Sequence, residues 1–347
     1  MRVLVTGATG FTGGHVARAL AQRGDQVRAL VRVSAAEAQR PGPATDKDRG
    51  TPAGPPRIAA LRAAGIEVIP GDLKDRDALA RAAAGVDIIY HVAAIYRQAA
   101  LGEEEYRAVN AAAVRSVVEA AAAGGARRVV HCSTVGVHGD VEHPPAAEDA
   151  PLKPGDIYQV TKLEGEHVAR QASADTGVEV VIARPTGIYG PGDRRLLKLF
   201  RGVARRRFVF LGSGKIYYHL TYIDDLVEGL RLCGTVPRAA GATYILAGAE
   251  VTTLNDLTAL IAEGAQVPPP RLHLPVWPFW TAGALCEALC APLGIEPPIY
   301  RRRVDFFTKS RAFDISRARA ELGYAPGVGL RDGISRTLGW YRAKGWM

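Results

Sequence analysis

A tyrosine and a lysine four residues apart form a pair that could do acid–base chemistry. Tyr158 and Lys162 bound the run Tyr-Gln-Val-Thr-Lys, and this spacing places both side chains on one face of a helix. A free phenol is a poor base near neutral pH, but a neighbouring ammonium favours the phenolate. The pair could therefore move a proton to or from a substrate oxygen.

Two adjacent hydroxyl groups precede this pair in the chain. Ser133 and Thr134 directly follow the apolar run Val129 to Cys132, which reads as a buried strand. Together with the three glycines near the N-terminus, these hydroxyls argue against a chance occurrence of the tyrosine and lysine spacing.

Three glycines follow the first apolar run, in the order strand, turn, helix. Gly7, Gly10 and Gly13 are spaced G-x-x-G-x-x-G. Gly7 permits a tight turn, Gly10 lets the backbone approach a pyrophosphate, and Gly13 lets the helix pack on the strand. The setting favours dinucleotide binding over a merely structural turn. The expected contacts in this loop are Gly7, Thr9, Gly10, Phe11, Thr12 and Gly13.

The ends of the next two apolar runs bear on the adenosine half of a dinucleotide. No acid closes the second run, which ends in Val31-Arg32. Arg32 suits a ribose 2′-phosphate and favours NADP(H) over NAD(H), unless it is simply a solvated arginine. Asp72, followed by Leu73, could accept a hydrogen bond from the adenine amino group, although a plain turn aspartate would look the same.

Short apolar runs alternate with alanine-rich stretches of helical spacing through the first half of the chain. The runs are Val3 to Val5, Val27 to Val31, Ile66 to Ile69, Val86 to Tyr90, Val129 to Cys132 and Val178 to Ala183, and the helical stretches include Val16 to Arg23, Asp77 to Ala84, Glu103 to Ala123 and Tyr158 to Thr176. Continuous apolar runs between helices are typical of parallel strands covered on both faces. The sequence predicts an α/β fold with a Rossmann-type doubly wound parallel sheet.

The alternation stops near residue 185. Short strands such as Phe208 to Leu211 and Tyr244 to Leu246 then mix with helices. We therefore expect a dinucleotide-binding domain over residues 1–184 and a smaller, mixed substrate-binding region over residues 185–347, with some interleaving of the chain. Ser34 to Arg57 is rich in proline and charge and reads as a loop that either closes over the adenosine phosphate or is an idle insertion.

Composition limits the class of protein. The 347 residues (37.0 kDa) are 48% hydrophobic and 23% charged, as in ordinary globular proteins. A net charge of +9 favours anionic ligands, but the basic residues are scattered and contain no nucleic-acid-reading motif. Four cysteines are too few for a disulfide framework, and with no export signal at the N-terminus we expect a cytoplasmic protein.

One segment is apolar enough to raise the question of a membrane. Val276 to Ile295 contains Trp277, Phe279 and Trp280, but two prolines and Glu287 argue against a spanning helix. We expect a core helix or a wall of the substrate pocket, with peripheral membrane contact as the alternative. Cys286 and Cys290 lie four residues apart there without further ligands, so no metal site is expected.

Taken together, these motifs resemble the extended short-chain dehydrogenase/reductase family, which includes nucleotide-sugar epimerases and dehydratases, dihydroflavonol reductases and 3β-hydroxysteroid dehydrogenases. The likeness covers nearly the whole chain. The matching segments are TGATGFTG, YQVTK, His91 to Ala94, Val109-Asn110, Ser133 to Gly139, Arg184 to Gly192 and Tyr222 to Asp225.

The resemblance implies roles for individual residues. Tyr158 would transfer the proton, Lys162 would tune it and bind the nicotinamide ribose, and Thr134 rather than Ser133 would polarise the substrate oxygen. Asn110 would support a proton relay. The other implied cofactor contacts are Ala93, Ala94 and Pro185, and the family implies a homodimer formed through the helix of Tyr158.

The sequence departs from one branch of this family. Sugar 4,6-dehydratases and decarboxylases carry an acid just after the strand-end hydroxyl, where this chain has Val135 and Gly136. This disfavours both chemistries. The remaining readings are hydride transfer between a secondary alcohol and a ketone, or a nucleotide-sugar epimerase that keeps its NAD and passes through a transient keto intermediate. The alternative from outside the enzymes is a sensor or scaffold protein that binds a dinucleotide without turnover.

Four cations could favour the epimerase by meeting a diphosphate, or could form a solvated helix face: Arg184, Arg194, Arg195 and Lys198. Arg32 and the aromatic run Trp277 to Trp280 instead favour an NADP(H)-dependent reductase with a partly apolar substrate. The sequence therefore predicts an NAD(P)-dependent oxidoreductase with epimerisation as its rival.

Overall fold

The computed structural model describes residues 1–32, 57–98, 101–290 and 301–347. Nearly all of the expected loop from Ser34 to Arg57 lies outside these residues, as does the end of the apolar segment that closes at Ile295.

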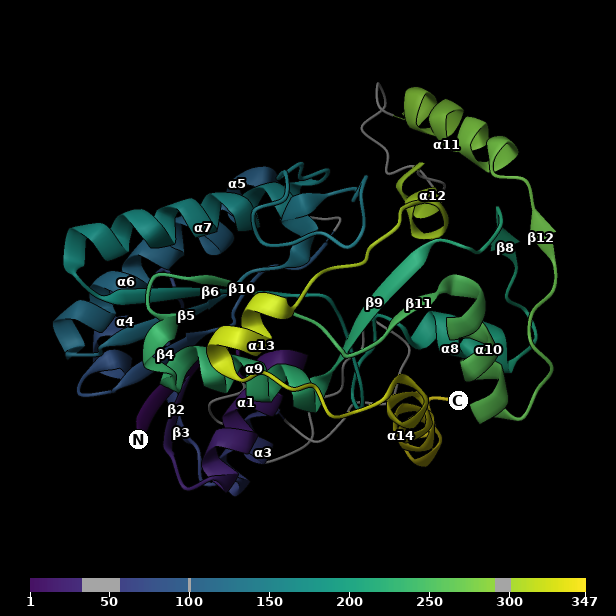
Figure 1. Cartoon of the computed structure of the whole chain (residues 1–347). Coiled ribbons are helices and arrows are strands. Elements are labelled where there is room, and N and C mark those ends of the chain that lie inside the picture. Colours follow the sequence, from purple (N-terminus) through teal and green to yellow (C-terminus); the bar gives the residue numbers. More distant parts are fainter. Residues whose placement is uncertain (33–56, 99–100, 291–300) are drawn as a thin grey trace.

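A seven-stranded sheet forms the centre of the molecule (Figure 1). Its strands are β1 (Arg2–Thr6), β2 (Gln26–Val31), β3 (Glu67–Pro70), β4 (Ile88–His91), β5 (Arg128–Cys132), β6 (Glu179–Pro185) and β10 (Thr243–Leu246). All pairings are parallel, in the order β10-β6-β5-β4-β1-β2-β3. From β1 the strands are added outward through β2 to β3, and from β4 they are added in the opposite direction through β5 and β6. The order of the strands therefore reverses between β1 and β4, which is where such sheets open a crevice for ligands. The predicted α/β class and doubly wound parallel sheet are confirmed.

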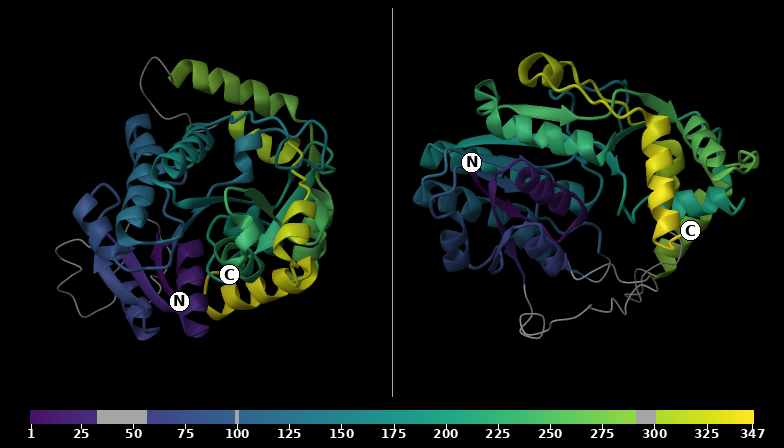
Figure 2. Two further views of the ribbon diagram at one scale, coloured as in Figure 1. Left: turned by 60° about the vertical axis from the view of Figure 1, so that its left-hand side comes forward. Right: turned by 90° about the horizontal axis from the view of Figure 1, so that it is seen from below.

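Helices cover both faces of this sheet (Figures 1 and 2). One layer holds α1 (Phe11–Gln22), α3 (Arg57–Ala63), α9 (Ile223–Thr235) and α13 (Ser316–Leu322), and the other holds α4 (Arg76–Ala83), α6 (Ala113–Gly124) and α7 (Ile157–Thr176). Val3 and Val5 of β1 join the core on the α1 side, whereas Leu4 between them joins Val117 of α6 on the other side. Burial of both faces explains why the strands read as continuous apolar runs.

The helical stretch after β4 differs from the sequence expectation. A single helix was expected over Glu103 to Ala123, but the structure has α5 (Glu103–Arg107), a π-helical turn η1 (Ala108–Ala112) and then α6. The wider turn carries Asn110 and packs against α7. Such π turns are uncommon and cluster at functional sites.

The second half of the chain builds a smaller region beside the sheet. It contains β7 (Gly187–Tyr189), β9 (Tyr217–Tyr222) and β11 (Val251–Thr253) in one sheet, β8 (Phe210–Leu211) and β12 (His273–Leu274) in another, and the helices α8 (Leu197–Ala204), α10 (Leu254–Ala265), α11 (Trp277–Cys290), α12 (Arg301–Thr308) and α14 (Leu330–Ala343).

The division at residue 184 stays a prediction, and the chain crosses it. Tyr244 to Leu246 was expected in the smaller region, but β10 is the edge of the central sheet beside β6. Tyr244, Ile245 and Leu246 of this strand are fully buried, so it has the same continuous apolar pattern as the strands of the first half.

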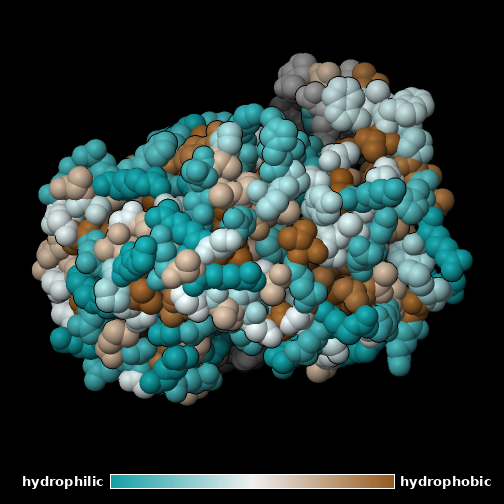
Figure 3. Space-filling model, viewed as in Figure 1, coloured by the Kyte–Doolittle hydropathy of each residue, from teal (hydrophilic) through white to brown (hydrophobic). Residues whose placement is uncertain are grey.

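Helix α11 stands at the rim of the smaller region (Figures 1 and 3). Trp277 is 70% exposed and Leu285 63%, so the expectation of a core helix is wrong for the described residues of α11. Cys286 and Cys290 are only partly buried. Among all described helices, none combines the length and the apolarity needed to cross a membrane.

Candidate active site

A cavity of about 730 Å³ opens at the carboxyl ends of the central strands. Both halves of the chain line it. The first half contributes the glycine loop, the loop after β4, the end of β5 and the start of α7, and the second half contributes the segment after β6 and helix α12.

The glycine loop forms one wall of the cavity, and Gly7, Thr9, Gly10, Phe11, Thr12 and Gly13 all line it. Gly7 has a φ of +74°, and a Cβ at this position would lie 2.8 Å from the Ala93 backbone. A Cβ at Gly13 would lie 2.3 Å from the Gly7 carbonyl oxygen, so glycine is required there for α1 to start so close to β1. The N-terminus of α1 faces the cavity and suits an anion such as a pyrophosphate.

Arg32, Asp72 and Leu73 lie together at one end of the cavity. The Arg32 Nε atom lies 4.0 Å from Asp72 Oδ2, and the arginine side chain is 75% exposed. A ligand in this part of the cavity would therefore meet one base and one acid.

Helix α7 begins at Asp156, whose Oδ1 accepts a hydrogen bond from the Gln159 N–H at 3.0 Å. Tyr158 in the first turn lines the cavity. Lys162, one turn further, is 1% exposed, and its Nζ has no hydrogen-bond partner within the described ranges. Burial lowers the pKa of Lys162 to about 8. A buried nitrogen in this state needs acceptors, and the hydroxyls of a nicotinamide ribose fit that need.

The two strand-end hydroxyls have different surroundings. Ser133 is buried, and its Oγ donates to Glu166 Oε1 at 2.6 Å. Thr134 Oγ1 accepts from the Gly136 N–H at 3.0 Å, at the start of the short helix η2 (Val135–His138). In the described part of the chain the Thr134 hydroxyl proton remains free for a ligand in the cavity, whereas the Ser133 proton does not.

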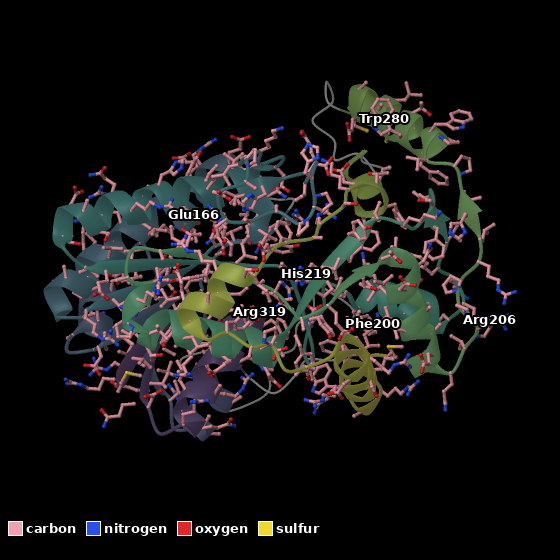
Figure 4. The ribbon with its side chains drawn as sticks, in the orientation of Figure 1. Glu166, Phe200, Arg206, His219, Trp280 and Arg319 are labelled. Carbon is pink, nitrogen blue, oxygen red and sulfur yellow. The ribbon has the colours of Figure 1, made fainter. Side chains whose placement is uncertain are left out.

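Glu166 also anchors the helix to the sheet. On the sheet side of α7 (Figure 4) it accepts two hydrogen bonds from Arg184 of β6, at 2.9 and 2.7 Å. Both side chains are almost fully buried. Arg184 is therefore engaged inside the fold rather than turned toward a diphosphate.

Of the four cations considered for a diphosphate, only Arg195 lines the cavity within the described chain. Its guanidinium carbon lies 5.2 Å from the centre of the Phe11 ring, and its Nε donates to Asp193 at 2.7 Å. Arg194 lies over the Trp346 ring, and Lys198 is exposed on α8. The sequence could not separate these cations because it does not show which way each one faces.

Asn110 lies behind the cavity wall rather than in it. Its amide donates to the Ile95 carbonyl at 3.1 Å and to Thr161 Oγ1 at 3.1 Å, and its Oδ1 accepts from the Ile95 N–H at 2.8 Å. These bonds join the loop after β4 to α7. Three of the other expected contacts, Ala93, Ala94 and Pro185, do line the cavity.

Tyr96 and Arg97, which lie beside Tyr158, were not predicted from the sequence. The Tyr96 ring packs edge-to-face against the Tyr158 ring at 4.9 Å between centres, and Arg97 lies against both. The conformation that brings them there is left-handed at Arg97, and no residue type in Ile-Tyr-Arg-Gln signals it. Position after a strand end was the only available clue.

Comparison with known proteins places this site in context. The model of the NAD dependent epimerase/dehydratase family matches residues 3–247. The chain is 30% identical over 350 residues to the 2-alkyl-3-oxoalkanoate reductase of Stenotrophomonas maltophilia, covering 97% of this chain and 98% of the relative.

Two further similar proteins have names that describe other reactions. The 3beta-hydroxysteroid-dehydrogenase/decarboxylase isoform 2 of Arabidopsis thaliana is 28% identical over 298 residues, which is 80% of this chain but only 52% of the relative, about half its length. The dTDP-glucose 4,6-dehydratase DesIV of Streptomyces venezuelae, solved with NAD and TYD bound, superposes with a TM-score of 0.75 at 25% identity, over 100% of this chain and 98% of that one. With a decarboxylase and a dehydratase among the similar proteins, the exclusion of these two chemistries stays a prediction.

Proposed function

The chain belongs to the NAD dependent epimerase/dehydratase family and is thus an NAD(P)-dependent enzyme of the oxidoreductase/epimerase type. We propose that it moves hydride between a nicotinamide and a secondary alcohol or ketone. The observation that carries the proposal is the presence of Tyr158 and Thr134 on the cavity wall, with Lys162 one helical turn beyond Tyr158. The buried ammonium of Lys162 has no hydrogen-bond partner among the described residues. This grouping supplies an acid–base group, a hydrogen-bond donor and a ribose-binding cation at one place.

Each of these residues would have a distinct task. The bound cofactor supplies or accepts the hydride. In reduction, the Tyr158 hydroxyl would give its proton to the carbonyl oxygen while the Thr134 hydroxyl donates a hydrogen bond to the same oxygen. In oxidation, the Tyr158 phenolate would take the proton from the alcohol. Lys162 would donate to the ribose hydroxyls and so hold the cofactor against Tyr158.

The substrate class we propose is a ketone with an apolar portion. Ile188, Tyr96 and Phe306 lie on the cavity wall and can accept apolar groups. The names of two relatives, a 2-alkyl-3-oxoalkanoate reductase and a 3beta-hydroxysteroid-dehydrogenase/decarboxylase, support the same class. We also propose that the protein forms a homodimer through α7, as the family resemblance implies, and light scattering tests this. We propose a cytoplasmic location as well, which cell fractionation tests.

Replacement of Tyr158 by Phe tests the proposal. With a panel of ethyl 3-oxobutanoate, a long-chain 2-alkyl-3-oxoalkanoate and a 3-oxosteroid, we expect turnover to fall by roughly 10²- to 10⁴-fold while cofactor affinity is retained. Tyr217→Phe is the control, because Tyr217 is exposed and is not part of the cavity wall. Unchanged turnover in Tyr158→Phe would remove the phenol from the mechanism, and a wild-type protein that binds cofactor but turns over nothing would favour the sensor reading.

We also propose that the cofactor is NADP(H), on the strength of Arg32 at the adenosine end of the cavity. Titration with NADPH and NADH measures the preference. We expect tighter binding of NADPH, and Arg32→Ala should remove most of the difference. Equal affinities in the wild-type protein would leave Arg32 a solvated arginine.

A nucleotide-sugar epimerase is the second candidate, favoured by Arg195 on the cavity wall. Mass spectrometry of the nucleotide released on denaturation separates the two. Stoichiometric NAD would indicate a cofactor that is recycled in place and would put UDP-glucose first among the substrates to test. An empty site would support a reductase that exchanges its cofactor.

A further inference from the structure

Arg97 has a backbone conformation that needs an explanation. Its φ is +34°, in the left-handed region that non-glycine residues seldom occupy. The other two such residues in the described chain, Arg206 and Gln266, lie in turns that end helices, where this conformation is common. Arg97 instead lies on the cavity wall. Residues held in this way cluster at functional sites, where the surroundings fix them.

Asp156 is the group that holds Arg97. The Arg97 Nη2 donates to Asp156 Oδ2 at 2.9 Å, while the other carboxylate oxygen caps α7. The Asp156 side chain is 9% exposed and that of Arg97 is 37% exposed, so the carboxylate is shielded from water while the arginine stays in contact with it. One carboxylate thus fixes both the first turn of the helix that carries Tyr158 and the arginine beside it.

The guanidinium held by Asp156 lies against two tyrosine rings. Its carbon is 5.3 Å from the centre of the Tyr96 ring and 5.9 Å from that of Tyr158, within the range of cation–π attraction. Its Nη1 donates to the Tyr96 hydroxyl at 3.2 Å. Tyr96 packs edge-to-face on Tyr158, so Arg97 and Tyr96 together buttress the ring of Tyr158.

We propose that Arg97 is a positioning residue for the proton-transfer step: held by Asp156, its guanidinium orients the Tyr158 ring through Tyr96 and stabilises the phenolate form of Tyr158. The inference rests on the proposed function only in assigning proton transfer to Tyr158. The electrostatic contact between Arg97 and Tyr158 exists whatever the substrate is.

The surroundings of Tyr158 support this assignment. Burial raises the pKa of Tyr158, as do Cys132 of β5 and Tyr96, whereas Arg97 and then Arg195 lower it. Lys162 of α7 also belongs to this neighbourhood, but it is itself buried, and burial reduces its own tendency to carry charge. Arg97 is the cation with the larger effect of the two arginines, so its removal should make the phenolate harder to form.

Three variants separate the charge of Arg97 from its backbone strain. Arg97→Gln removes the cation and keeps a strained residue, Arg97→Gly removes both, and Arg97→Lys keeps a cation without the planar fork. Arg115→Gln is the matched control. Arg115 of α6 has the same side-chain exposure, 37%, and pairs with Asp175 near the C-terminal end of α7 at 2.8 Å, and neither residue lines the cavity.

The first readout needs no substrate. Tyrosine labelled with ¹³C at Cζ reports ionisation of each phenol by NMR in the NADP⁺ complex, and the signal missing from Tyr158→Phe identifies Tyr158. We expect Arg97→Gln and Arg97→Gly both to move the Tyr158 midpoint up by about one pH unit or more. The fraction of Tyr158 that is ionised at pH 10 and the chemical shift of its neutral form at pH 7 should change with the midpoint. Arg97→Lys should restore the midpoint in part, and Arg115→Gln should have the wild-type midpoint.

The second readout is the pH profile of kcat/KM for oxidation of ethyl 3-hydroxybutanoate. Its acid limb should move to higher pH in Arg97→Gln and Arg97→Gly, with kcat lowered and cofactor affinity unchanged. A wild-type midpoint, phenolate fraction and chemical shift in both variants would overturn the inference, even if Tyr158→Phe abolishes turnover. A shifted midpoint in a protein without any oxidoreductase activity would instead overturn the proposed function and leave only the stabilisation of the Tyr158 phenolate by Arg97 standing.

Discussion

At the scale of single residues, Ser133 and Thr134 show how two identical functional groups can have different uses. Both residues line the cavity, but Ser133 donates to the buried carboxylate of Glu166, whereas no described residue accepts the hydroxyl proton of Thr134. Thr134→Val should therefore lower kcat/KM by about 10²- to 10³-fold, the effect of losing one donor to a developing oxyanion. Its cost in the free energy of unfolding should be about 1 kcal/mol, because the variant also loses the hydrogen bond that caps η2. Steady-state kinetics and urea unfolding of the same variant measure both quantities.

Ser133→Ala should show the opposite balance. The loss of a donor to a buried carboxylate should cost about 1–3 kcal/mol in the free energy of unfolding, while kcat/KM changes far less than in Thr134→Val. If Ser133→Ala proved the more damaging to catalysis, the roles of the two hydroxyls would have to be exchanged.

The sequence predicted where along the chain the site residues lie better than it predicted which of them contact one another. The spacing of Tyr158 and Lys162 and the glycine pattern could be recognised because helical periodicity and glycine turns are local properties. Arg97 could not be recognised, because its contact with Tyr158 depends on a left-handed conformation and on Asp156, which is 59 residues further along the chain.

At the scale of elements, the junction between α7 and the central sheet rests on Glu166 and Arg184. Glu166→Gln removes one charge from this buried pair and should cost about 3–5 kcal/mol in the free energy of unfolding, because it leaves the Arg184 cation poorly compensated. Glu142→Gln, which breaks an exposed pair with Lys153, serves as the control and should change stability very little. Chemical denaturation at pH 7 measures both variants.

The same pair predicts a pH dependence. Burial alone would raise the pKa of Glu166, but the hydrogen bonds and charge of Arg184 together with the bond from Ser133 outweigh it, so the pKa lies below its ordinary value. A carboxyl with a lowered folded-state pKa contributes stability that is present above its unfolded pKa of about 4.3 and is lost as pH falls through the folded value. Unfolding measured from pH 6 downward should therefore be steeper in wild type than in Glu166→Gln, and parallel curves would contradict the role of this pair.

The apolar runs predicted the strands of the sheet well, since burial on both faces leaves an unmistakable continuous pattern. They failed where tertiary contacts decide: the π turn that carries Asn110 interrupts a helix whose periodicity looks unbroken, and β10 is recruited to the sheet across residue 184. The exposure of α11 could not be predicted from the sequence either, because its apolar residues are typical of a core helix.

At the scale of the whole molecule, the cavity joins the two halves of the chain, so cofactor binding should stabilise both together. The glycine loop and Arg195 lie on the same cavity wall although they come from different halves, and Arg195 contacts Phe11 directly.

A ligand at 100 times its dissociation constant adds about 2.7 kcal/mol to the free energy of unfolding when only the folded state binds it. Thermal unfolding with saturating NADPH should therefore move as one transition to higher temperature. Arg195→Ala should reduce the ligand-dependent shift more than it changes the unliganded midpoint, since the arginine connects the glycine loop with the second half of the chain. Two separate transitions, of which only one responds to NADPH, would mean instead that the halves unfold independently and that the contact between Arg195 and Phe11 does not couple them.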